Sequence, residues 1–286
     1  MFKLLFVLAA LALASPAAAQ TASPAPVEAD WHVIPPQEIM VITLGEGRQV
    51  FVRLAPRYAP GHVANIRRLA AAYWWDGAAV YRVQDNYVAQ WGDPTDEKPL
   101  PPLVIENPPA EYDWPRYDGV TSFARPDPYA ARTGHSADGW PLASDGKSSW
   151  LVHCYGMVGV ARDEPPSTGS GAALYAVIGH APRHLDRNIT LVGRVVEGIQ
   201  WLSSLPRGTG QAGVYRTPEE RAPILSVRLA SQLPEEDRPV FQYRATDNER
   251  FAAWIRAREN RSEKFFVAPA GGADICNAEA PVRRVR

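Results

Sequence analysis

The chain has 286 residues, with 30 lysines and arginines against 31 aspartates and glutamates, and a formal net charge of −1. This nearly neutral balance gives no electrostatic reason to expect nucleic acid or an anionic membrane as a partner. The length is enough for one large hydrophobic core, with or without an extension. Composition therefore argues against the strongly basic classes of binding protein and predicts a globular chain.

The first residues have the three parts of a secretory signal peptide. Lys3 supplies the positive charge, residues 4–13 form a short apolar run, and a small-residue site ends at Ala19. We predict cleavage after Ala19, which removes residues 1–19 and leaves a periplasmic or secreted protein. The alternative is that the segment stays uncleaved as an anchor. No later run approaches the length of a membrane span, so no membrane association is expected.

After this segment the chain shows the pattern of a mainly β fold. Residues 20–37 are rich in proline, alanine and glutamate and are expected to form a flexible lead-in. Helical spacing predicts one helix from Pro60 and a short one over 198–205. Short, mainly apolar runs between turn signals predict eight strands, at residues 38–44, 48–54, 78–83, 87–92, 157–162, 173–178, 190–196 and 224–230. Eight strands and two helices fit a closed antiparallel barrel capped at its ends.

Two regions interrupt this pattern. Residues 94–153 are rich in proline, aspartate, glycine and tryptophan with little periodicity, and we expect a long irregular insertion that packs through its aromatic residues. The C-terminal extension, 234–286, contains a capping signal at Thr246. The residues that follow predict a helix whose apolar stripe docks on the barrel or, alternatively, binds a partner; the stripe consists of Phe251, Trp254 and Ile255.

The chain has two cysteines, Cys154 and Cys276. In an oxidising compartment such a pair predicts a disulfide, here one that would tie the extension to the barrel. No CxxC spacing supports a zinc site. The six histidines are scattered and are expected on the surface or in loops, so no bound metal is predicted.

One short segment carries the clearest indication of chemistry. Arg82 lies among alternating apolar residues, and Gln90 follows just before a Gly-Asp pair. Across a turn at 85–86, the period of a strand places Val80 and Val88 on the same face of a hairpin as these two polar residues. A guanidinium and a carboxamide beside apolar groups suit a donor-lined groove. The alternatives are a surface ion pair for Arg82 and a structural amide for Gln90.

This segment resembles the central motif of the cyclophilins, the peptidyl-prolyl cis-trans isomerases. The resemblance covers about 38–233, interrupted by the insertion. Five blocks occur in the order of that family, at Ala59–Ile66, Tyr73–Gly77, Val80–Asp93, Gly156–Arg162 and Gly193–Gly198.

The resemblance implies an eight-stranded barrel with a groove on its outer face, which binds proline-containing polypeptides without a nucleophile or cofactor. By matching position, Arg82 would be the catalytic donor and Gln90 would hold the substrate carbonyl. The remaining groove positions are Tyr87, Val88, Ala161, Leu174, Tyr175, Leu185 and Ile189. The expected function is isomerisation of X-Pro bonds in exported proteins. The oligomeric state is left open.

The second half of the chain departs from the family pattern. Within 168–177 the rim glutamine is absent, and either Leu174 or Tyr175 stands for the pocket aromatic. His184 replaces a tryptophan and Ile189 a histidine. A second hypothesis is therefore a proline-peptide-binding module that is catalytically weak or inactive. A serine hydrolase built on the Gly-Ser-Gly at 169–171 lacks the required strand–turn–helix context.

Overall fold

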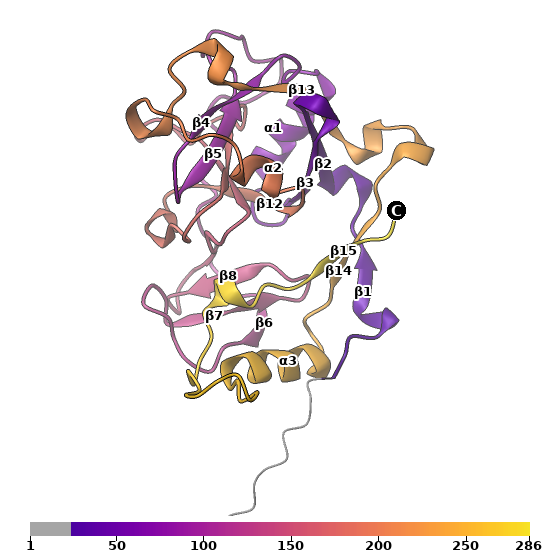
Figure 1. Ribbon diagram of the computed structural model, residues 1–286, viewed down its shortest axis with the longest axis vertical. Coiled ribbons are helices and arrows are strands. Elements are labelled where there is room, and N and C mark those ends of the chain that lie inside the picture. Colours follow the sequence, from indigo (N-terminus) through magenta and orange to yellow (C-terminus); the bar gives the residue numbers. More distant parts are fainter. Residues whose placement is uncertain (1–23) are drawn as a thin grey trace, which may run out of the picture.

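The computed structural model describes residues 24–286, so the predicted signal peptide and its cleavage site lie outside the described residues. The chain forms two lobes (Figure 1). One lobe is a β-barrel, and the smaller one is a sheet covered by a helix. A third, narrow sheet runs along the side where the lobes meet.

The larger lobe is a closed barrel of eight antiparallel strands, in the order β10-β11-β5-β4-β13-β2-β3-β12. Its strands are β2 Ile39–Leu44, β3 Gln49–Leu54, β4 Ala79–Val83, β5 Val88–Gly92, β10 Met157–Val160, β11 Leu174–Val177, β12 Leu191–Glu197 and β13 Ala222–Leu229. The predicted fold class is confirmed, and each expected strand lies within two residues of an observed one at either end.

Alternation explains how these strands form the barrel. On β2, Met40 and Ile42 point into the barrel core, whereas Ile39 and Val41 pack outward against the tail residue Phe241. Helix α1, Pro60–Ala71, buries Val63, Ile66 and Leu69 in the barrel core, and α2, Gln200–Ser203, is a single turn. Proline begins α1 because its missing N–H has no intrahelical partner at that position.

The insertion was expected to be irregular, but the structure shows that it is partly regular. It contains a four-stranded antiparallel sheet in the order β6-β7-β8-β9. The strands are β6 Gly119–Ser122, β7 Arg132–Ser136, β8 Pro141–Ser144 and β9 Ser149–Leu151. All residues of β8 and β9 are buried, so they show no alternation of apolar and polar residues from which a strand could be recognised.

The lead-in is also more ordered than expected. Strand β1, Trp31–Val33, pairs with β14, Phe241–Arg244, which in turn pairs with β15, Val282–Arg284. Part of the lead-in thus becomes a strand, because its hydrogen-bonding partner comes from the far end of the chain. Residues from both ends of the described chain therefore form one sheet.

Helix α3, Glu249–Glu259, begins three residues after the predicted capping signal. Asn248 is its N-cap, and its side chain accepts a hydrogen bond from the Phe251 backbone N–H at 3.0 Å. Phe251 and Ile255 are fully buried, as the predicted stripe requires. Phe251 packs edge-on against His135 of β7, with ring centroids 5.2 Å apart. The helix therefore docks mainly on the sheet of the insertion, beneath β6 and β7 in Figure 1, rather than on the barrel.

Short 3₁₀ turns connect these elements. In the described residues they are Glu28–Asp30, Pro36–Glu38, Gly45–Gly47, Arg183–Leu185, Gln211–Gly213, Pro218–Glu220, Ala230–Gln232, Glu235–Asp237 and Ile275–Asn277. Within residues 24–286, no helix has the length and apolar character needed to cross a membrane.

Candidate active site

Arg82 and Gln90 face each other across β4 and β5, as predicted. The placement of Val80 on their face was wrong, because a β-bulge between Val80 and Arg82 turns Val80 into the barrel core. Arg82 Nη1 donates to Gln90 Oε1 at 2.8 Å, Nη2 donates to Gln84 Oε1 at 2.5 Å, and Nε donates to the Ala212 carbonyl at 2.7 Å. These bonds use three of the five guanidinium N–H groups and leave one on each Nη. No carboxylate in the described part of the chain forms an ion pair with Arg82. The guanidinium is therefore held in place and still has two N–H groups available as donors.

The loop between α2 and β13 completes this arrangement. Strand β4 pairs with β13 only through Ala79 and Val80, and beyond them the loop residue Val214 bridges to Arg82. Gly213 lies so close to the hairpin that a Cβ added to it would come within 2.6 Å of the Cα of Gln84. An open cavity of about 470 Å³ is lined by this loop, from residue 210 to residue 216. The loop is thus packed against the hairpin that carries the arginine.

An apolar cluster lies on the outer face of the barrel beside these polar groups. The pairing of β11 with β5 places Tyr175 opposite Gln90 and Val177 opposite Val88. The cluster comprises the buried Val88, Tyr175 and Val177 and the half-buried Tyr87, Leu185 and Ile189. Five of the seven predicted groove positions are therefore brought together.

The other two positions lie elsewhere. Leu174 is fully buried in the core of the barrel and lies opposite Trp91, because successive side chains of a strand point to opposite faces. Of the two candidates for the pocket aromatic, Tyr175 is therefore the one at the groove, and the assignment of Leu174 was wrong. Ala161 follows β10, where its N–H donates to the Ala173 carbonyl at 3.0 Å, and it is not part of the apolar cluster.

The edge of the cluster carries a second polar feature. Tyr87 stacks on the exposed His184, with ring centroids 6.0 Å apart and an interplanar angle of 7°. The Arg82 guanidinium carbon lies 5.9 Å from the centroid of the Tyr87 ring. Tyr87 thus connects the arginine with the position where the family pattern has a tryptophan.

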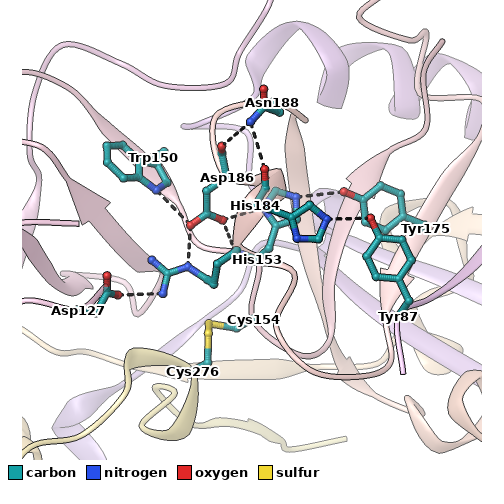
Figure 2. Close-up of polar contacts among 11 residues, drawn as sticks. Tyr87, Asp127, Trp150, His153, Cys154, Tyr175, His184, Asp186, Asn188 and Cys276 are labelled. Atoms are coloured by element: carbon teal, nitrogen blue, oxygen red, sulfur yellow. Dashed lines mark hydrogen bonds and ion pairs between the residues drawn. A yellow bond between two sulfur atoms is a disulfide. The ribbon is translucent and has the colours of Figure 1, made fainter. Parts of the chain in front are cut away.

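Behind the cluster, buried polar groups form a chain of hydrogen bonds (Figure 2). The Tyr175 hydroxyl lies 3.0 Å from His153 Nε2, and His153 Nδ1 lies 2.9 Å from Asp186 Oδ1. Asp186 Oδ2 accepts from Arg183 Nε at 2.7 Å, and Arg183 Nη1 donates to Asp127 Oδ2 at 2.8 Å. Sequence reasoning missed these hydrogen bonds and expected the histidines on the surface or in loops. His62, His135 and His153 are buried instead, the first two within α1 and β7.

The environment sets the charge of each group in this chain. Burial lowers the pKa of His153 and raises that of Tyr175 well above its usual value, so both are neutral. Burial by itself would raise the pKa of Asp186, but the hydrogen bond from His153 and the charge and hydrogen bond of Arg183 outweigh it and lower that pKa. The hydrogen-bonded groups therefore include the ionised carboxylate of Asp186, the neutral imidazole of His153 and the neutral phenol of Tyr175.

The predicted disulfide is present. Cys154 and Cys276 are bonded, with their Cα atoms 5.0 Å apart. Cys154 follows His153 directly, so the bond joins the extension to the backbone behind the apolar cluster (Figure 2). Among the described residues, no group of histidine, cysteine, aspartate and glutamate has the geometry of a metal site.

A closed eight-stranded barrel with an arginine, a glutamine and an apolar cluster on its outer face is the arrangement expected of a prolyl isomerase. The model of the cyclophilin type peptidyl-prolyl cis-trans isomerase family matches residues 39–229. The chain belongs to this family, and peptidyl-prolyl cis-trans isomerase activity follows from that membership.

Similar proteins agree with this assignment. The chain is 27% identical over 187 residues to a probable peptidyl-prolyl cis-trans isomerase of Brucella suis, covering 65% of this chain and 80% of that protein. It is 30% identical over 125 residues to the Arabidopsis thaliana peptidyl-prolyl cis-trans isomerase CYP23, covering 42% and 52%. Among solved structures, cyclophilin AquaCyp293 from Hirschia baltica has a TM-score of 0.70 at 24% identity, covering 90% of this chain and 96% of that one, which shows a shared fold.

Proposed function

We propose that this protein isomerises X-Pro bonds in exported polypeptides, with Arg82 as the donor to the prolyl nitrogen. One observation carries the assignment of Arg82. Three hydrogen bonds hold its guanidinium beside the apolar cluster, and one N–H on each Nη remains for a ligand. The arginine is preorganised, and its charge is not committed to a carboxylate.

The chemistry requires only a well-placed donor. Resonance of the X-Pro amide creates a rotational barrier of about 18–20 kcal/mol. When the bond twists, the prolyl nitrogen becomes pyramidal and its lone pair can accept a hydrogen bond. An N–H of Arg82 that donates to this lone pair stabilises the twisted state more than the planar one, and only such differential binding raises turnover. Arginine suits the role because it stays protonated.

Gln90 supplies the second polar contact. Its Oε1 accepts from Arg82, and its Nε2 donates to the Tyr81 hydroxyl at 2.6 Å. Because arginine can only donate, this contact fixes which end of the amide is oxygen. One N–H of Gln90 Nε2 remains to hold the substrate carbonyl, while the proline ring packs on the cluster around Tyr175 and Val88.

The exported context rests on two features. The N-terminal segment has the pattern of a signal peptide, and a disulfide between Cys154 and Cys276 suits an oxidising compartment. Periplasmic or secreted clients with exposed prolines are therefore the proposed substrates.

The alternative function is a proline-peptide-binding module with little catalysis. One observation favours it: residues 168–177, the segment where the resemblance expects a glutamine, contain none, so the rim lacks that amide. Isomerisation of an X-Pro peptide by the wild-type protein, measured by NMR exchange, separates the two functions. Catalytic exchange supports the isomerase. Peptide binding without faster exchange would establish the binding module instead.

A further inference from the structure

The turn that contains Asp186 has two faces. Leu185 and Ile189 belong to the apolar cluster, while the side chain of Asp186, between them in sequence, is only 6% exposed and points into the interior. Whatever holds the Asp186 carboxylate therefore also holds one wall of the proposed proline pocket.

The Asp186 carboxylate is held by four donors. Oδ1 accepts from the His153 backbone N–H at 3.0 Å and from its ring Nδ1 at 2.9 Å. Oδ2 accepts from Arg183 Nε at 2.7 Å and from Trp150 Nε1 at 3.3 Å. Since Arg183 is bonded in turn to Asp127, three of the groups behind this wall come from the insertion, 94–153.

The same contacts determine the orientation of Tyr175. Because the ionised Asp186 accepts from His153 Nδ1, the proton of the neutral imidazole lies there, and Nε2 is left as an acceptor for the Tyr175 hydroxyl. The Tyr175 hydroxyl therefore points inward to His153 (Figure 2), while the ring belongs to the apolar cluster. The Tyr175 side chain passes over Gly159, where a Cβ would come within 2.4 Å of the ring and of the hydroxyl. A glycine at this site lets the hydroxyl reach His153.

We propose that His153 and Asp186 are positioning residues for the proline pocket, and that the insertion serves to support this pocket from behind. The proposal rests on the proposed function, which it deepens. His153 holds Tyr175, the floor of the pocket, and Asp186 holds the turn that carries Leu185. Neither group touches the reacting bond, so both act on the binding of the proline ring, which is similar in the planar and twisted states.

Tyr175→Phe tests the proposal, because it removes the hydroxyl and keeps the ring. A uniform loss of binding raises KM and leaves kcat unchanged. We expect KM for an X-Pro peptide to rise about five- to tenfold, the effect of one lost buried hydrogen bond, with kcat within twofold of wild type. Tyr117→Phe is the matched control. Its hydroxyl has a side-chain partner, Ser122 at 3.3 Å, and Tyr117 packs against a different cluster from that of the pocket, so both parameters should be unchanged.

A double-mutant cycle locates the effect. His153→Asn keeps a donor for Asp186 but is too short to reach Tyr175, so it should raise KM as Tyr175→Phe does. The double variant should then cost no more than either single change. An unchanged KM in Tyr175→Phe, a loss confined to kcat, or additive effects in the cycle would overturn the proposal.

The test also separates this proposal from the proposed function. If the wild type binds an X-Pro peptide without isomerising it, the peptide Kd replaces KM as the measured quantity. Tyr175→Phe should still raise that Kd about five- to tenfold. A Kd equal to that of the wild type would refute the positioning role, whatever the catalytic activity.

Discussion

Glu111 of the insertion caps the first helix of the barrel at His62. Its carboxylate accepts hydrogen bonds from the backbone N–H groups of Gly61 at 2.7 Å and His62 at 3.1 Å, and lies 2.6 Å from His62 Nδ1. The residue before α1, Ala59, has no side chain that could do this. A carboxylate at a helix N-terminus also interacts favourably with the helix dipole. The insertion therefore also completes an element of the barrel, the first turn of α1.

Glu111→Ala should destabilise the protein. It leaves two backbone N–H groups of the first helical turn without a partner, and losses of this kind are about 1–2 kcal/mol. Urea unfolding should show a lower midpoint with an unchanged slope. Glu111→Gln keeps an acceptor oxygen and should lose less. Equal stability of the alanine variant and the wild type would show that water replaces the carboxylate at no cost.

Arg82→Ala should lower turnover far more than peptide affinity. The donor acts on the twisted nitrogen, so its loss should reduce kcat by about a hundred- to a thousand-fold, the range known for oxyanion-hole donors. Arg82→Lys should lose nearly as much, because an ammonium cannot bond Ala212, Gln84 and Gln90 in one plane. Gln90→Ala should lose less, since it positions the substrate. Equal activity of Arg82→Ala and wild type would exclude this arginine as the donor.

Removing the disulfide should destabilise the protein. The bond closes a loop between residues 122 positions apart, for which chain entropy predicts about 4–5 kcal/mol, although typical losses are about 2–4 kcal/mol. Cys154→Ser with Cys276→Ser should therefore melt at a lower temperature than the oxidised wild type. The wild type under reducing conditions should melt like the double variant. Thiol titration of the denatured, unreduced wild type should detect no free thiol; two free thiols would contradict the pairing.

The barrel could be predicted from the sequence because its strands carry their own signal. The continuous apolar run of β2 is local, and so is the helical spacing of α1. The remaining features depend on contacts between distant residues. Strand β1 exists only because β14 pairs with it, and β8 shows no alternation because both its faces are buried. These elements have no local pattern that would reveal them.

The same distinction applies to the site. Arg82 and Gln90 share one hairpin, so their proximity followed from the strand period. The choice between Leu174 and Tyr175 required the register of β11 on β5, which only the structure supplies. His153 could not be recognised at all, because its partners Tyr175 and Asp186 are 22 and 33 positions away. A pattern of neighbouring residues cannot report such contacts.

Acid should destabilise the protein through His135, which is fully buried between Phe123 and Phe251. Burial, helped by the nearby charge of Arg194, lowers the pKa of His135 to about 3. The unfolded chain takes up this proton near pH 6.5 and the folded chain only near pH 3, so the unfolded state binds more protons between these values. Stability is then lost as the pH falls from 6.5, by about 1.4 kcal/mol per unit. His153 acts in the same direction, since burial lowers its pKa too.

The measurement is the free energy of unfolding as a function of pH. His135→Gln does not titrate in this range, so its stability should fall less steeply than that of the wild type. Between pH 6.5 and pH 5 the difference between the two proteins should change by about 2 kcal/mol in favour of the variant. His180→Gln, at an exposed histidine, should instead follow the wild-type curve in parallel. If His135→Gln also runs parallel to the wild type, His135 is not the group that makes the fold sensitive to acid.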